Sequence, residues 1–118
     1  MGYTSEIRVI LKRQDFEELK KKMSKYYKEK NYDYDLFDTN DYLLMVEENE
    51  NWVKFGWNGL KWYKGYEDVD LIMEFIESRE QYHYMRLGEE YGDLEERDML
   101  EYEEDCPEPS YVSQYIED

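Results

Sequence analysis

The sequence predicts an α+β domain with an antiparallel sheet, and two features of its pattern support this class. Segments of four to eight residues that alternate apolar and polar side chains favour strands, whereas two segments with apolar residues every three or four positions favour helices. The chain has 118 residues, which is enough for one domain. Its aromatic fraction of 18% argues against the disorder that a charged fraction of 39% would otherwise favour.

The first strand is predicted over residues 4–11, whose alternation gives one buried face made of Ser5, Ile7, Val9 and Leu11. A helix is predicted to begin at Asp15, because an acid with Glu18 three positions later is a variant of the capping box. This helix is expected to end near Lys30. Its buried stripe has spacings of three and four: Phe16, Leu19, Met23 and Tyr26.

Residues 42–47 and 52–57 are predicted to form two strands joined by the polar turn Glu48-Asn49-Glu50-Asn51. The second of these strands places Val53, Phe55 and Trp57 on one face. Asn58-Gly59 is a strong signal for a type I′ turn. It leaves two alternatives: a tight hairpin with a returning strand over residues 60–63, or a bulge within one longer strand.

A second helix is predicted from Glu67 to about Arg79, because acidic residues favour a helix N-terminus. The next segment, residues 81–87, is predicted to be a strand. Its side chains alternate between two faces, with His83, Met85 and Leu87 on one and Tyr82, Tyr84 and Arg86 on the other. The element order then predicts a four-stranded antiparallel sheet with two helices on one face, resembling a ferredoxin-like β-α-β-β-α-β fold. A meander with flanking helices fits the same order.

The composition changes after Gly88. Residues 89–105 are mostly acidic but include tyrosine and leucine, so they are predicted to be ordered, with a short helix or an edge strand over residues 94–104. They complete a single α+β domain over residues 1–105. Cys106-Pro107-Glu108-Pro109 ends any regular element, so residues 106–118 are predicted to form a short C-terminal tail.

The net charge of −16 is unevenly distributed along the chain. Residues 1–30 carry nine basic and five acidic side chains, whereas residues 89–118 carry one basic and thirteen acidic side chains. Such a field repels nucleic acid and anionic membranes and attracts basic surfaces. The basic first helix opposite an acidic segment also permits self-association, including a homodimer.

A soluble, cytoplasmic protein is predicted, because the N-terminus has no signal-peptide pattern and no apolar run is long enough for a membrane span. Cys106 is the only cysteine, so no intrachain disulfide can form. No catalytic residue is predicted. His83, the only histidine, is expected to be a satisfied core residue, and acids near Cys106 are expected to raise the pKa of its thiol.

No metal site or cofactor is predicted either. The acids Asp33, Asp35, Asp38 and Asp41 resemble an oxygen-ligand cluster, but an EF-hand that began at Asp33 would need a glycine where Asp38 stands. The lysines of the first helix form a basic patch, but the total charge opposes direct binding of nucleic acid. No cysteine–histidine spacing typical of zinc sites occurs.

The acidic segment is the feature that points to a function. Duplex DNA carries one charge per about 1.7 Å, so ten base pairs carry about 20, and the net charge of −16 is of that order. The chain resembles the small acidic proteins that phages and mobile elements encode to block host defence nucleases, such as anti-CRISPR and DNA-mimic inhibitors. The resemblance rests on size, charge, the α+β pattern and the run Glu89-Glu90-Tyr91-Gly92-Asp93-Leu94-Glu95-Glu96. It is one of general character, and no residue role is carried over.

This resemblance implies a phage-encoded, non-enzymatic inhibitor that acts in the host bacterial cell and docks on the basic nucleic-acid-binding surface of a defence protein such as a nuclease. Acids of residues 33–50 are expected to assist in steering. The predicted partner-binding residues are Glu89, Glu90, Tyr91, Asp93, Glu95, Glu96, Asp98, Glu101, Tyr102, Glu103, Glu104, Asp105 and Trp57.

Two alternative functions are left open by the sequence. One is a nucleotide-binding protein, or sponge for a nucleotide signal, that uses an aromatic and basic hairpin made of Trp52, Lys54, Trp57, Lys61, Trp62, Tyr63 and Lys64. The other is a structural protein of a phage.

Overall fold

The computed structural model describes residues 2–112 and 116–118. These residues form two helices, α1 (Arg13–Glu29) and α2 (Glu67–Glu77), and two antiparallel sheets. The main sheet contains β1 (Ser5–Lys12), β2 (Leu44–Glu48), β3 (Trp52–Leu60), β4 (Tyr82–Gly88) and β5 (Leu94–Asp98). The second sheet pairs β6 (Tyr111–Val112) with β7 (Ile116–Glu117). The predicted α+β class is confirmed.

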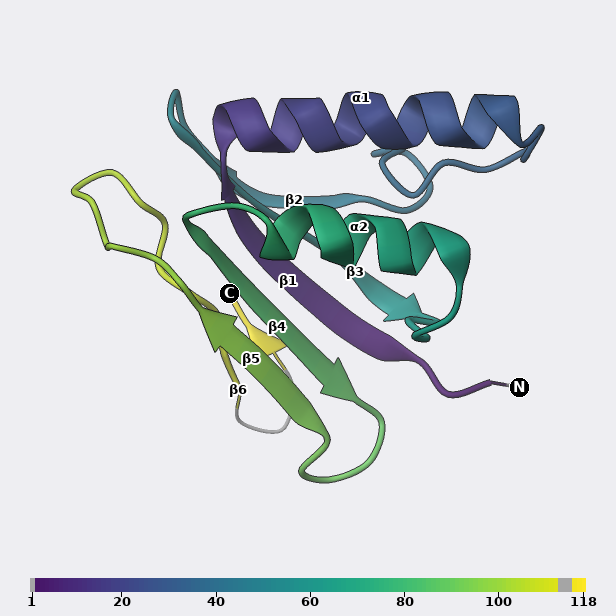
Figure 1. The fold of residues 1–118 in the computed structure, drawn as a ribbon. Helices are drawn as coiled ribbons and strands as arrows, with labels where there is room; N and C mark the ends of the chain where they lie inside the picture. The colour runs from purple at the N-terminus through teal and green to yellow at the C-terminus, as the bar shows by residue number, and fades with distance from the viewer. Residues whose placement is uncertain (1, 113–115) are drawn as a thin grey trace.

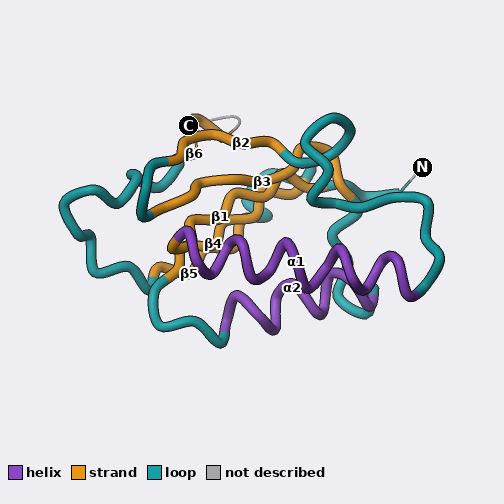
Figure 2. The backbone as a smooth tube through the Cα atoms, turned by 90° about the horizontal axis from the view of Figure 1, so that it is seen from above, coloured by secondary structure: helices purple, strands orange, loops and turns teal. Residues whose placement is uncertain are grey.

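The main sheet has the strand order β2-β3-β1-β4-β5, and each pair of neighbours is antiparallel. Both helices cover one face of this sheet (Figure 1), and the view along the sheet in Figure 2 separates the helix layer from the strand layer. The predicted number of four strands is wrong, because β5 adds a fifth strand beside β4. The edge-strand alternative for the acidic segment is therefore the correct one over Leu94–Asp98.

The core lies between the helices and one face of the sheet. β1 contributes Ile7, Val9 and Leu11, which pair across the strand with Trp57, Phe55 and Val53 of β3. The helices contribute a larger apolar set, all buried: Phe16, Leu19, Met23, Tyr27, Val69, Ile72, Phe75 and Ile76. Branched and aromatic residues at alternating strand positions produce this packed layer, as the sequence pattern predicts.

Helix α1 differs from its prediction at the N-terminus and in one buried residue. It begins at Arg13, and its N-cap Lys12 makes no side-chain capping hydrogen bond. The predicted capping role of Asp15 is wrong, because its carboxylate lies 3.7 Å from the Arg79 guanidinium instead. Tyr27, not Tyr26, completes the buried stripe, and its hydroxyl donates to the buried Asp68 carboxylate at 3.0 Å.

The Asn58-Gly59 signal is a bulge in β3 and not a hairpin turn. β3 continues to Leu60, which pairs with Ser5 of β1, while Trp57 pairs with Ile7. Two residues of β3 therefore oppose the single residue Glu6, and Gly59 supplies the positive φ of 62° that the bulge requires. The alternative of a returning strand over residues 60–63 is wrong.

The C-terminal segment packs on the second face of the sheet, the face opposite the helices. Figure 2 shows β6 and the C-terminus on that side of the strand layer. Its Pro107, Ser110 and Ile116 are buried. The segment predicted as a short C-terminal tail thus places buried residues, Ile116 among them, against this face of the sheet.

Two cations on the second face explain how the segment is held. The side chains of Arg8 and Lys54 are 6% and 5% exposed, and the carboxylate of Asp118 lies 3.0 Å from the first and 3.9 Å from the second. The Lys54 ammonium also donates to the carbonyl oxygen of Glu108 at 3.0 Å. Buried charges require such partners, so the end of the chain neutralises cations that the sheet itself leaves unpaired.

Candidate partner-binding surface

The acidic edge is defined as residues 89–105, which comprise β5 and the loops on either side of it. It contains ten acidic residues and one basic residue, Arg97. β5 is the last strand in the sheet order, and all five of its residues are exposed. The structure therefore presents this acid on an ordered strand at the border of the sheet.

Arg86 on β4 holds two of the acids in place. Its guanidinium donates to Asp93 at 2.6 Å and to Glu95 at 2.5 Å. The Asp93 carboxylate also accepts a hydrogen bond from the Tyr3 hydroxyl. Hydrogen bonds from Arg86, and then from Tyr3, lower the pKa of Asp93. Arg86 thus offsets part of the negative charge at this end of the acidic edge.

His83 lies on the second face and is 1% exposed. Its Nε2 is 2.7 Å from a carboxylate oxygen of Glu96, which stands on the neighbouring strand β5. The prediction of a satisfied core histidine is confirmed. Glu96 thereby both satisfies a buried ring and presents an exposed carboxylate on the acidic edge.

The loop after β5 is tied back to the body at two places. The side chain of Gln81 donates to Glu103 at 2.9 Å and accepts from the backbone N–H of Glu101 at 3.0 Å. Asp105 accepts from the Trp52 indole N–H at 3.1 Å and from the Asn51 side chain. Hydrogen bonding by Asn51 lowers the pKa of Asp105 in spite of some burial.

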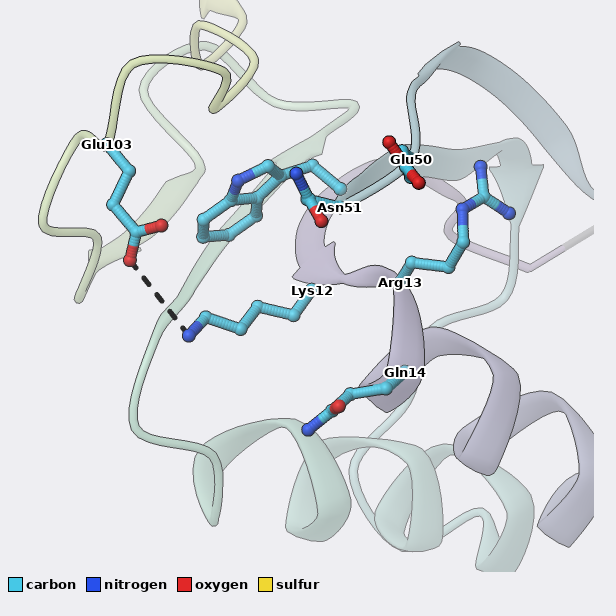
Figure 3. A pocket seen from close by; sticks show the side chains of 7 residues that line it. Lys12, Arg13, Gln14, Glu50, Asn51 and Glu103 are labelled. Carbon is cyan, nitrogen blue, oxygen red and sulfur yellow. Dashed lines mark ion pairs between the residues drawn. The ribbon is translucent and has the colours of Figure 1, made fainter.

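A polar cavity of about 380 Å³ lies where this loop meets the start of α1 (Figure 3). The Lys12 ammonium is 4.0 Å from the Glu103 carboxylate across it, and 6.0 Å from the centre of the Trp52 ring. The cavity is lined by Lys12, Arg13, Gln14, Glu50, Asn51, Trp52 and Glu103. Lys12 and Glu103 pair across the cavity, and Asn51 and Trp52 bond Asp105, so these contacts join the loop after β5 to the body of the protein.

Several side chains of the acidic edge point into solvent. Glu90, Glu101 and Glu104 are exposed, and the described residues give their carboxylates no ion pair or hydrogen bond. Tyr91 is as exposed as an isolated residue, and three further apolar side chains along the acidic edge are exposed. These are Leu94, Met99 and Tyr102. The edge thus combines uncompensated acid with the apolar groups that binding surfaces use.

Tyr102 has a backbone φ of 56°, a value in the left-handed region that few residues other than glycine adopt. Its hydroxyl donates to the Asp98 carboxylate, and this hydrogen bond together with partial burial raises the pKa of Tyr102 to about 12. This hydrogen bond links the loop to the last residue of β5. Glu89, the remaining predicted residue, accepts from the backbone N–H of Thr4.

Trp57 does not belong to this surface. It is 1% exposed, its indole N–H donates to the carbonyl oxygen of Leu36 at 2.6 Å, and its ring stacks on Trp62 with centroids 5.2 Å apart. The prediction of Trp57 as a partner-binding anchor is wrong, because its position in β3 points toward the helices. Twelve of the thirteen predicted residues lie on the acidic edge, whereas Trp57 lies in the core.

The aromatic and basic hairpin does not form a stacking platform. Trp52, Trp57 and Trp62 are all buried, and Trp52 lies on the opposite face of the sheet from the other two. Lys54 is buried beneath the C-terminal segment. Since the indoles are covered and their N–H groups are bonded within the protein, no indole is free for a nucleotide to stack on. Of the remaining predicted residues, Tyr63 is half-buried and Lys61 and Lys64 are exposed.

Cys106 follows the acidic edge and is half-buried. Burial, with the nearby carboxylates of Glu103 and Asp105, raises the pKa of its thiol to about 11. The predicted direction of this shift is confirmed. A thiolate is therefore scarce at neutral pH, and the position gives no support to a nucleophilic role.

The sequence analysis missed several residues that hold the surface. Arg86, Asn51 and Trp52 fix acids of the edge, and Arg8 fixes the segment that follows it. Arg86 carried a usable signal, because it is the only cation between Arg79 and Arg97 and precedes a dense run of acids. The sequence around Asn51 and Trp52 gave no signal of their role, since their hydrogen bonds to Asp105 join segments more than fifty positions apart.

Comparisons with known proteins give no identity to set beside this geometry: no family model, no curated protein and no solved structure matches the chain. Across residues 2–112 and 116–118, the helices are too short or too polar to cross a membrane. In the same residues, no three acidic, histidine or cysteine side chains gather as a metal site would require.

The pairing of Asp93 with Arg86 predicts a specific pH response. In the wild type, the NMR titration midpoint of the Asp93 carboxylate is expected below its ordinary pKa of 3.8, and Arg86→Gln is expected to raise that midpoint. A carboxylate with a lowered pKa stabilises the folded state above about pH 3.8, and this contribution is lost as the pH falls through the folded-state pKa. Glu101, which has no such partner among the described residues, is the control. A midpoint for Asp93 that Arg86→Gln leaves unchanged would show that the ion pair does not form in solution.

Proposed function

We propose that this chain is a non-enzymatic inhibitor, of the kind phages encode against host defence, that binds the basic nucleic-acid-binding surface of a defence protein through its acidic edge. The observation that supports this proposal is the composition of one exposed border of the sheet. Uncompensated carboxylates and four exposed apolar side chains share this border. Charge of one sign steers association and selects the partner, whereas aromatic side chains supply most of the binding energy.

The net charge of the protein is comparable to that of a DNA duplex of the same length, as a protein that replaces nucleic acid on a binding surface requires. The longest dimension of the molecule is 41 Å, over which duplex DNA carries about 24 charges. The net charge of −16 reaches about two-thirds of that figure. A cation-lined groove that accepts a duplex would therefore meet a comparable electrostatic field.

The rigidity of the edge supports the same proposal. The acids held by Arg86, His83, Gln81 and Asn51 are ordered before a partner binds, so binding must chiefly order the side chains of Glu90, Glu101 and Glu104. A preorganised surface loses less conformational entropy on association than a flexible acidic tail. The alternative of a nucleotide sponge is not favoured, because the indoles it requires are buried.

We also propose that the segment from β1 to β4 is a ferredoxin-like unit to which β5 has been added. Its support is the order β2-β3-β1-β4 among these strands, with antiparallel neighbours and both helices on one face. The sheet as a whole departs from that pattern because β5 extends its border. On this interpretation the added strand carries the function, since β5 is the centre of the acidic edge.

The proposal is tested by capture of partners from a bacterial lysate at low salt, identification by mass spectrometry, and measurement with the purified partner. The affinity is expected to fall steeply between 50 and 500 mM salt, and duplex nucleic acid is expected to displace the protein. An affinity that is constant over this range, or a complex that duplex nucleic acid leaves intact, would overturn the proposal.

Two matched variants locate the surface. The double variant Glu101→Gln with Glu104→Gln is expected to lower the affinity for the partner by about 2- to 30-fold. An exposed ion pair contributes about 0.2–1 kcal/mol, and this variant removes two of them. Asp33→Asn with Asp41→Asn removes the same charge from an exposed loop near the opposite border of the sheet, and a smaller loss is expected. Equal losses would show that only the total charge matters and that the acidic edge is not the binding surface.

A further inference from the structure

The backbone of β5 has a defined orientation. At the two ends of its ladder with β4, the Gly88 N–H donates to the Asp93 carbonyl and the Met99 N–H donates to the Tyr82 carbonyl, both at 2.8 Å. In an antiparallel pair, residues alternate between those that bond the neighbouring strand and those that do not. The N–H and C=O groups of Glu96 and Asp98 therefore point away from β4, toward the open border of the sheet.

This border differs from the one at the other end of the sheet. β2 pairs with β3 through a register shift between Met45 and Glu47, and such irregularities disfavour the addition of another strand. The β4–β5 ladder runs without a shift from Leu94 to Asp98. β5 thus offers a regular row of backbone donors and acceptors to an incoming extended segment.

The side chains around β5 specify which segment fits. Leu94, Glu96 and Asp98 lie on the second face, with His83 and Met85, whereas Glu95 and Arg97 lie on the helix face. A second copy of the strand would place carboxylates opposite carboxylates, which is unfavourable. A strand with Lys or Arg at every other position would instead place cations beside Glu96 and Asp98, and its intervening residues beside Arg97. Those intervening positions must be uncharged or acidic.

We propose that the partner binds by adding an extended segment with alternating basic residues to the open edge of β5. This inference rests on the proposed function and specifies how the acidic edge is recognised. Backbone hydrogen bonds supply part of the affinity in such complexes, and alternate side chains supply the specificity. The carboxylates of Glu96 and Asp98, which disfavour pairing between the β5 strands of two copies, thus favour a basic strand.

The test uses the full-length protein and a capped peptide of four Lys-Thr repeats as the probe, with amide chemical shifts as the readout. We expect this peptide to shift the amides of β5, and a peptide of the same composition with its lysines in one block to bind at least about 3-fold more weakly. Salt should weaken both peptides, since both carry the same charge.

The decisive variants are Glu96→Pro and Glu96→Ala. Both remove the carboxylate, but only proline also removes the outward N–H. Proline is tolerated at an edge position whose N–H faces solvent, so the two variants are expected to have the same melting temperature. Glu96→Pro is expected to bind the alternating peptide roughly 3- to 10-fold more weakly than Glu96→Ala, the effect of one net hydrogen bond.

The outcomes separate the inference from the function on which it rests. If Glu96→Pro and Glu96→Ala bind equally while Glu101→Gln with Glu104→Gln still weakens binding, strand addition is wrong and the acidic surface remains. If the two glutamine changes and 500 mM salt also leave binding unchanged, the proposed function itself is wrong. Should Glu96→Pro melt well below Glu96→Ala, its N–H lies within the ladder, and the strand orientation that the inference requires is contradicted.

Discussion

Replacement of Trp57 by alanine is expected to lower the free energy of unfolding by about 3–5 kcal/mol. Trp57 is 1% exposed and meets Phe37 and Phe55 edge to face, with ring centroids 5.5 and 5.7 Å away. Its removal leaves a cavity in the layer beneath the helices and an unpaired carbonyl at Leu36. A domain of this size is stable by only about 5–15 kcal/mol, so much of the stability would be lost.

Urea denaturation at pH 7 measures this effect, with Tyr91→Ala as the control. Tyr91 is fully exposed, so its replacement is expected to change stability by less than about 0.5 kcal/mol. The two variants also separate packing from binding, because Tyr91→Ala is expected to lower the affinity for the partner without affecting the fold. A Trp57→Ala protein of wild-type stability that failed to bind would restore the original interpretation of Trp57 as a surface anchor.

Replacement of Asp118 by alanine is expected to cost about 2 kcal/mol, although the residue stands at the end of the chain. It leaves Arg8 and Lys54 buried without their shared carboxylate, a change that costs about 3–5 kcal/mol at a fully buried ion pair. The smaller figure allows for solvent screening, because the Asp118 side chain is 28% exposed. Burial lowers the pKa of Lys54, and Asp118 opposes that shift, so the variant should also lower it further.

The same urea experiment tests this prediction, with Glu117→Ala as the neighbouring control that is expected to change little. Burial acts to raise the pKa of Asp118, but hydrogen bonds from Ser110 and Arg8 outweigh it, and the net shift is downward from 3.8. Because the folded pKa is lowered, the stabilisation is complete above about pH 3.8 and disappears as the pH falls through the folded value. The stability difference between wild type and Asp118→Ala should therefore narrow below that pH. Equal stability at pH 7 would mean that the two cations have other partners.

Local pattern was sufficient for most of the fold. The alternation of Ile7, Val9 and Leu11 and the helical spacing of Phe16, Leu19 and Met23 each follow from a single element that buries one face. The order of those elements then limits the topologies that connect them. The pattern could not predict that the second face of β1 is buried. Arg8 lies on that face, and an arginine there predicts exposure to solvent unless its ion-pair partner is known. That partner, Asp118, lies 110 positions away.

The charge of the candidate surface could be predicted from the sequence, but the side chains that hydrogen-bond its acids could not. A dense run of acids is visible in the sequence, and the structure places it together on one border. Trp57 was misassigned although the alternation of its strand places it on one face with Val53 and Phe55, and that face lies in the core against the helices. The ties from Gln81 and Asn51 to the acidic loop are non-local and leave no periodic signal.

The bond between Arg8 and Asp118 has a consequence for biosynthesis. The two residues are 110 positions apart, so at about 5–20 residues per second roughly 5–20 s separate their translation. During that interval the nascent chain can form the helix side of its sheet while the opposite side, with its unneutralised cation, stays uncovered on the ribosome. Closure of that side is thus expected only after Asp118 has been synthesised, and chaperones that recognise exposed apolar sheet have that interval in which to bind.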